Sequence, residues 1–78
     1  MKEYRNEKGQ LHKTNGPALI WSDGRKEWWI NGKRHREDGP AVEWDDGIKS
    51  WYLNGIEYTE DQYHQELIKL KLKRLINL

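Results

Sequence analysis

Arginines and aromatic residues interleave along the middle of the sequence, and this mixture could support stacking chemistry. Aromatic rings and guanidinium planes form platforms on which nucleotide bases stack. The same mixture also arises when the aliphatic stems of arginines cover rings that would otherwise face water. Both interpretations stay open from the sequence, and we favour the second. The residues concerned are Arg25, Arg34 and Arg36, which interleave with Trp28, Trp29 and Tyr52, and of these rings Trp29 and Tyr52 are the candidates for binding.

Histidines and carboxylates could support metal binding or acid–base catalysis, but their spacing favours neither. His12 and His35 stand at equivalent positions of an internal repeat, so we expect each to serve its own unit, for example by bonding a turn carbonyl. The chain has no cysteine and lacks the HxH and HExxH spacings of metal sites. GxSxG, P-loop and GxGxxG motifs are also absent. We predict a non-enzymatic protein with no catalytic residue, metal ion or cofactor.

The internal repeat determines where these residues lie. Residues 12–18 recur as residues 35–41, and the same offset of 23 places residues 28–32 on residues 51–55. Each unit carries an Asp-Gly and an Asn-Gly pair, which are strong hairpin signals because Gly and Asn tolerate positive φ. Short β-prone runs separate these turns, at residues 18–21, 26–30, 41–44 and 49–53. The pattern predicts a meander of short antiparallel strands.

Alternation along these runs predicts which side chains face the core. Trp29 and Tyr52 point the other way, toward a surface that is either half-covered or used for binding. The eight residues expected in the core are Leu19, Trp21, Trp28, Ile30, Val42, Trp44, Trp51 and Leu53.

After residue 58 the repeat ends and the periodicity becomes helical. Thr59 and Gln62 have the spacing of a capping box, and Tyr58 can pack against Tyr63. We predict an amphipathic helix over residues 60–77 with two apolar faces. The first face holds Tyr63, Leu67, Leu70 and Leu78, and the second holds Ile68, Leu72, Leu75 and Ile76.

One apolar face is enough to pack on a small sheet, so the second face needs another explanation. We expect it to form the seam of a homo-dimer or higher oligomer, or to contact a partner groove. The alternative is that a frayed helix end wraps around the sheet and uses both faces. The basic residues Lys69, Lys71, Lys73 and Arg74 either form the solvated side of the helix and complement its dipole, or meet an acidic partner.

The composition indicates one small domain. Its 78 residues include 14 Lys and Arg against 13 Asp and Glu, so no overall charge marks a nucleic-acid binder. No apolar run approaches the roughly 20 residues that cross a bilayer, and the chain opens with charged residues rather than a signal peptide. We expect a cytoplasmic, mainly β (α+β) protein without membrane contact. Hairpin repeats should occupy residues 1–58, and a capping or oligomerisation helix residues 59–78.

The unit W-W-I-N-G-K-R-H-R-E-D-G-P-A at residues 28–41 resembles the W-x-x-N-G-x-x-H-R-x-x-G-P-A repeats of small bacteriophage and large-virus proteins. Those repeats are similar to MORN repeats, which are β-hairpin units stacked into an elongated sheet, although MORN repeats have a different Tyr and Gly framework. The resemblance covers roughly residues 4–58. It implies a viral, non-enzymatic accessory protein in the host cytoplasm, and it brings with it neither catalytic residues nor lipid binding.

Small phage proteins of this size commonly counter host defences, either by blocking a host protein or by sequestering a nucleotide signal. Applying this to the present chain is an analogy, because a fold does not establish a function. Our first hypothesis is therefore a protein-interaction module that inhibits a host protein through the second helix face and the exposed aromatic row. The alternative hypothesis is a sponge-like binder of nucleotides or single-stranded nucleic acid that uses Trp29, Tyr52 and the arginines.

Overall fold

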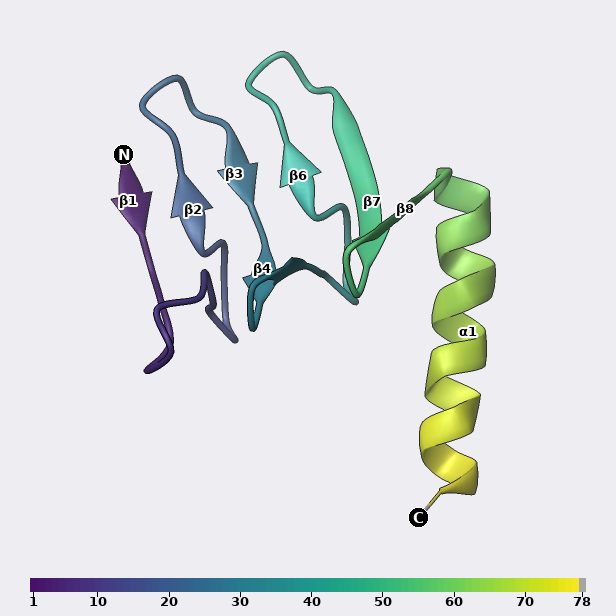
Figure 1. The fold of residues 1–78 in the computed structure, drawn as a ribbon. Coiled ribbons are helices and arrows are strands. Elements are labelled where there is room, and N and C mark those ends of the chain that lie inside the picture. The colour runs from purple at the N-terminus through teal and green to yellow at the C-terminus, as the bar shows by residue number, and fades with distance from the viewer. Residues whose placement is uncertain (78) are drawn as a thin grey trace.

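The computed structural model describes residues 1–77, which form short antiparallel strands followed by one helix (Figure 1). The elements are β1 (Lys2–Glu3), β2 (Leu19–Ile20), β3 (Lys26–Glu27), β4 (Trp29–Ile30), β5 (Lys33–Arg34), β6 (Val42–Glu43), β7 (Lys49–Leu53), β8 (Ile56–Tyr58) and α1 (Glu60–Ile76). Six strands form a sheet in the order β1-β2-β3-β6-β7-β8, and β4 pairs with β5 as a separate hairpin. The predicted class, a mainly β chain of antiparallel hairpins with one C-terminal helix, is confirmed.

The sheet is a single layer, and α1 covers only its far end (Figure 1). The described part of the molecule measures 41 × 32 × 17 Å, so it is flat. The helix contacts β7 and β8, the last two strands of the sheet. Its C-terminal half runs past the edge of the sheet (Figure 1), and residues 71–77 are all exposed.

The Asn-Gly pairs make the tight turns that the sequence predicts. Asn31 and Gly32 have φ values of 47° and 81°, and Asn54 and Gly55 have φ values of 51° and 83°. Two successive positive φ values are the mark of a type I′ turn, whose twist matches that of the flanking strands. These turns join β4 to β5 and β7 to β8.

The offset of 23 residues seen in the sequence also appears in the hydrogen bonds. Gly32 N donates to Leu11 O at 2.9 Å, and Gly55 N donates to Arg34 O at 2.8 Å. Both the donor and the acceptor of the second bond lie 23 residues after those of the first. The sequence repeat is therefore a repeat of backbone pairing.

The repeated histidines have a structural role, as expected, but with the opposite hydrogen-bond direction. His12 Nδ1 accepts from the Asn31 amide at 3.0 Å, and His35 Nδ1 accepts from the Asn54 amide at 2.9 Å. The predicted bond to a turn carbonyl is thus wrong, because the turn offers a donor. Each ring must keep Nδ1 unprotonated, which places the proton of the neutral ring on Nε2. Each histidine ties one unit to the Asn-Gly turn of the next.

The buried core differs from the predicted one. Leu19, Val42 and Leu53 are buried as expected. The other five predicted core residues are only half-buried, because a single-layer sheet leaves broad side chains partly uncovered; they are Trp21, Trp28, Ile30, Trp44 and Trp51. Four residues that the prediction omitted are also buried: Glu27 in β3, and Ala18, Pro40 and Ala41 in the segments that lead into β2 and β6.

Strand register divides the predicted core between two faces of the sheet. Glu27 pairs with both Leu19 and Val42, and residues paired across strands share a face. On β7, Trp51 and Leu53 lie on the face that packs against α1. Tyr52 between them points to the other face, which is the side of Glu27.

The helix begins at the predicted capping box. Thr59 Oγ1 accepts from the Gln62 amide at 3.2 Å, and the Gln62 side chain accepts from the Thr59 amide at 3.1 Å. These bonds satisfy amide groups that would otherwise lack partners at the helix start. The predicted span of residues 60–77 agrees with the observed helix, which Asn77 caps.

The first apolar face of α1 packs on the sheet. Tyr63 and Leu67 are buried together with Leu53, and Trp51 and Tyr58 pack around them. Tyr63 Oη donates to the Arg36 carbonyl, and burial raises the pKa of the tyrosine. Leu78, predicted on this face, lies outside the described residues.

Candidate binding surfaces

The carboxylate of Glu27 organises one face of the sheet. Its side chain is only 3% exposed, and burying a carboxylate without partners would be strongly unfavourable. Its oxygens accept hydrogen bonds from Trp21 Nε1 at 2.7 Å, Trp29 Nε1 at 3.1 Å and Arg34 Nε at 3.2 Å. Arg25 Nε adds an ion pair at 3.6 Å. Three hydrogen-bond donors and the nearby charge of Arg25 thus surround one carboxylate.

The arginines on this face cover the aromatic rings. The Arg34 guanidinium lies 5.3 Å from the ring centroids of both Trp29 and Tyr52, and it donates to Tyr52 Oη at 3.2 Å. Arg25 lies 4.1 Å from the Trp21 ring centroid. Four of the predicted binding residues therefore meet on one face, but they do so by packing around Glu27. A base could stack between Trp29 and Tyr52 only if it displaced Arg34.

Arg36 lies on the opposite face from these residues. Its guanidinium is 3.7 Å from the Trp28 ring centroid and bonds to Glu43 at 2.9 Å and to Pro40 O at 3.0 Å. Gly39 makes room for this side chain, because a Cβ there would lie 2.9 Å from Arg36 Cζ. Arg36 therefore stabilises the Gly-Pro-Ala segment. It takes no part in the Glu27 cluster, which consists of Glu27 and the residues around its carboxylate: Trp21, Arg25, Trp29 and Arg34.

A series of hydrogen bonds links the sheet to the end of α1. Arg74 donates two bonds to the Glu37 carboxylate, at 2.5 and 2.6 Å. His35 Nε2 donates to the same carboxylate at 2.7 Å, since its Nδ1 already accepts from Asn54. Mainly because Arg74 donates to it, the pKa of Glu37 is lowered from 4.5 to about 2. These contacts hold the half of α1 that extends past the sheet.

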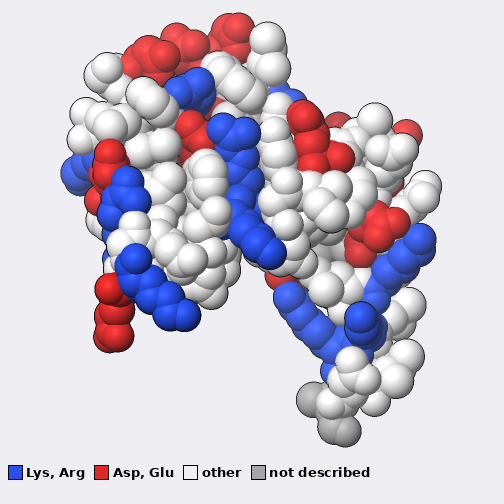
Figure 2. Space-filling view, in the orientation of Figure 1, with Lys and Arg blue, Asp and Glu red and all other residues white. Residues whose placement is uncertain are grey.

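An open groove of about 880 Å³ separates the lower edge of the sheet from the C-terminal half of α1. Figure 2 shows the notch between the two. Arg36 and Arg74 lie on its walls, and carboxylates already pair with both. Lys13 lines the groove on the sheet side, where its Nζ lies 3.8 Å from the centroid of the Tyr4 ring, and Lys71 lines the groove on the helix side. Its lining mixes polar side chains with Trp28 and Ile30, and carboxylates pair with half of its four Lys and Arg residues.

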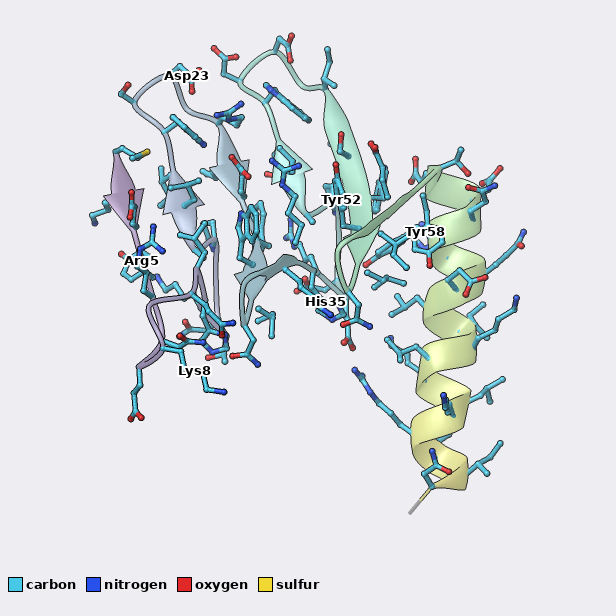
Figure 3. All side chains as sticks on the ribbon, viewed as in Figure 1. Arg5, Lys8, Asp23, His35, Tyr52 and Tyr58 are labelled. Carbon is cyan, nitrogen blue, oxygen red and sulfur yellow. The ribbon has the colours of Figure 1, made fainter. Side chains whose placement is uncertain are left out.

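The second apolar face of α1 is exposed, and we call it the α1 stripe. It consists of Ile68, Leu72, Leu75 and Ile76, which are 59%, 53%, 65% and 81% exposed. Side chains along the outer side of α1 project away from the sheet (Figure 3). Because the helix is regular through Ile76, the alternative of a frayed end that wraps around the sheet is wrong. The structure leaves these four predicted partner-binding residues uncovered.

Sequence reasoning overlooked two carboxylates that organise these surfaces, Glu27 and Glu37, and it named Arg74 only as part of the basic cluster of the helix. Glu27 had a detectable signal, because Arg25, Glu27 and Trp29 alternate and so share one face of an extended chain. The Glu37–Arg74 pair had none, because 37 residues separate its members and only the docking of α1 brings them together.

Residues 1–77 contain neither a metal-binding group of side chains nor a membrane-spanning helix. No three His, Cys, Asp or Glu side chains in this range are placed to hold a metal ion. In the same range, no helix combines the length and apolar character needed to cross a membrane.

Comparison with known proteins finds no matching family model, curated protein or solved structure. Among the surfaces described above, the α1 stripe is the one that exposes four large aliphatic side chains together.

Proposed function

We propose that this protein is a non-enzymatic binding module that acts by protein–protein contact through the α1 stripe. The observation that carries this proposal is the exposure of four large aliphatic side chains in one stripe, on a helix whose opposite face is already packed. Single exposed apolar residues are ordinary, whereas a contiguous set marks an interaction surface. The Glu27 cluster and the Arg36 contacts have structural roles and need no partner.

The anchoring of α1 supports the proposal. The capping box holds the first turn, and the Arg74–Glu37 pair holds the last turns. A surface that is already ordered loses less conformational entropy when it binds. The stripe is therefore presented in a form suited to docking against a rigid partner.

For the biological setting we propose a phage accessory protein that inhibits a host protein in the host cytoplasm. The resemblance of residues 28–41 to viral repeats and the absence of cysteine support this setting. A homo-dimer or higher oligomer through α1 is a second candidate, because the same exposed stripe would form its seam.

Binding of a nucleotide or single-stranded nucleic acid has weaker support. It would need an open ring face at Trp29 or Tyr52, and Arg34 lies against both rings. A thermal-shift assay with cyclic nucleotides and short single strands tests it, and a clear rise in Tm would favour it over protein contact.

The stripe is tested by capture from a bacterial lysate with immobilised protein, followed by mass spectrometry. Leu72→Glu should lose the partners that the wild type retains, because it places a charge at the centre of the stripe. Ile48→Glu is the matched control, since Ile48 is 60% exposed on the hairpin between β6 and β7, away from α1. If both variants retain the wild-type partners, contact through the stripe is refuted. Sedimentation of the same proteins measures self-association.

A further inference from the structure

Lysines border the α1 stripe on both sides. At 100° per residue, Lys69 and Lys73 lie about 60° and 100° from Leu72 on one side, and Lys71 lies about 100° away on the other. All three side chains are exposed. Only Lys69 has a carboxylate partner among the described residues, Glu66 at 3.2 Å. From residue 67 to residue 77 the chain carries no Asp or Glu at all.

The helix dipole explains only part of this border. Its effect falls off within the last turn, which accounts for Lys73 and Arg74. Lys69 and Lys71 lie earlier in the helix, where the dipole contributes little. Arg74 is already neutralised by Glu37, so the positive charge that remains surrounds the apolar surface. The dipole therefore leaves Lys69 and Lys71 unexplained.

A second copy of the chain fits this surface poorly. Suppose that two copies of α1 pack antiparallel about a two-fold axis at Leu72. The flank that carries Lys71 then lies beside the same flank of the second copy, and so does the flank that carries Lys69 and Lys73. Lys71 would then face its own counterpart, as would Lys73, and like charges across an interface disfavour association. The acidic residues of α1, Glu60, Asp61 and Glu66, lie toward its other end and cannot compensate at the crossing point.

We propose that the α1 stripe docks an acidic amphipathic helix of a partner protein. This inference rests on the proposed function and adds the chemistry of the partner. The partner's apolar residues pack on Ile68, Leu72, Leu75 and Ile76, and its Glu or Asp side chains flank them and pair with the three lysines. The stripe spans eight residue steps, or about 12 Å at 1.5 Å per residue, so a partner helix of three to four turns covers it.

Two designed peptides of about 20 residues test this inference, a length chosen because shorter isolated helices are marginal. Both carry the same leucine stripe; Glu flanks it in one peptide and Lys in the other. Fluorescence anisotropy should give a Kd for the Glu peptide at least about tenfold lower than for the Lys peptide. The preference should shrink as salt is raised, because exposed charges are screened.

Charge reversal in the protein provides the reciprocal test. The double variant Lys71→Glu, Lys73→Glu should reverse the preference between the peptides. The matched control, Lys2→Glu with Lys8→Glu, changes the net charge equally but lies at the other end of the molecule, and it should bind as the wild type does. Circular dichroism of both variants confirms that α1 is intact.

Three outcomes would overturn the inference. The first is equal affinity for both peptides, and the second is binding to phosphatidylglycerol vesicles in preference to the Glu peptide. The third is a stable dimer of the wild type that Leu72→Glu dissociates. The proposed function fails separately, if Leu72→Glu retains every captured partner. Loss of capture by Leu72→Glu together with equal peptide affinities would leave a binding module whose partner is not acidic.

Discussion

Replacing Glu27 by Gln tests how the flat sheet is stabilised. The substitution preserves the shape of the side chain but removes its charge, and it leaves one acceptor oxygen where there were two. Trp21 and Arg34 donate to different oxygens of the carboxylate, and Trp29 shares one of them with Arg34. In the variant an amide NH₂ group would face at least one of these N–H donors.

The expected loss of stability can be estimated from these contacts. A buried donor left without an acceptor costs about 1–3 kcal/mol. The remaining hydrogen bonds also lose the part of their strength that depends on the charge of the acceptor. Arg25 and Arg34 are 27% and 36% exposed, so water compensates part of the lost ion pairing. We expect a total of about 3 kcal/mol, or a fall in Tm of about 12–24 °C for a domain of this size.

Urea unfolding, followed by both circular dichroism and tryptophan fluorescence, measures this loss. Glu57→Gln is the control, because Glu57 is exposed on β8 and the same chemical change there should alter stability by less than about 0.5 kcal/mol. If Glu27→Gln loses less than about 1 kcal/mol while Glu57→Gln behaves as expected, the carboxylate does not organise this face. The proposed structural role of the arginines would then be wrong.

Glu37→Gln should lower the free energy of unfolding at pH 7 by about 1 kcal/mol. This is well below the free energy that corresponds to the full pKa shift, because the ion pair with Arg74 is partly exposed to water. Folding lowers the pKa of Glu37, so the extra stability of the wild type over the variant should be complete above about pH 4.5 and vanish toward about pH 2. Urea titrations across this range measure the difference in unfolding free energy. A difference that does not change with pH would contradict the ion pair. Gly39→Ala should cost about 1 kcal/mol or less, because the atoms that must move away from the new Cβ are the flexible end of Arg36, which would shift over Trp28. Gly16→Ala, at the equivalent repeat position with its nearest atom 3.8 Å away, should be close to neutral in the same assay. Tyr63→Phe should cost about 1–2 kcal/mol, because it leaves the Arg36 carbonyl without its donor; unchanged thermal unfolding would refute that role.

Local signals in the sequence predicted much of the fold. The Asn-Gly turns need positive φ at two successive residues, and those residue types adopt it at low cost. The capping box depends only on residues three apart. The two apolar faces of α1 follow from its periodicity, so their residues were predicted, whereas the exposure of the second face was not settled by the sequence. The hydrogen-bond direction at His12 and His35 was not, because a sequence does not show which group of a turn faces the ring.

Burial within the sheet was predicted less well. Alternation correctly separates Trp28 from Trp29 and Trp51 from Tyr52, but it does not show which residues of neighbouring strands share a face. Cross-strand register decides that, and it places Glu27 between Leu19 and Val42. A charged residue was therefore left out of the predicted core, although its partners include Trp21 and Trp29.

The sequence by itself determined the features that depend on neighbours along the chain: the repeat, its turns, the start of α1 and the amphipathic character of the helix. Only the tertiary structure decided which donors surround Glu27, that Arg74 reaches Glu37, and that the α1 stripe remains uncovered. The physical reason is the range of the interactions. Backbone preferences act over a few residues, whereas ion pairs and burial depend on strand register and helix docking, which bring together residues up to 37 positions apart.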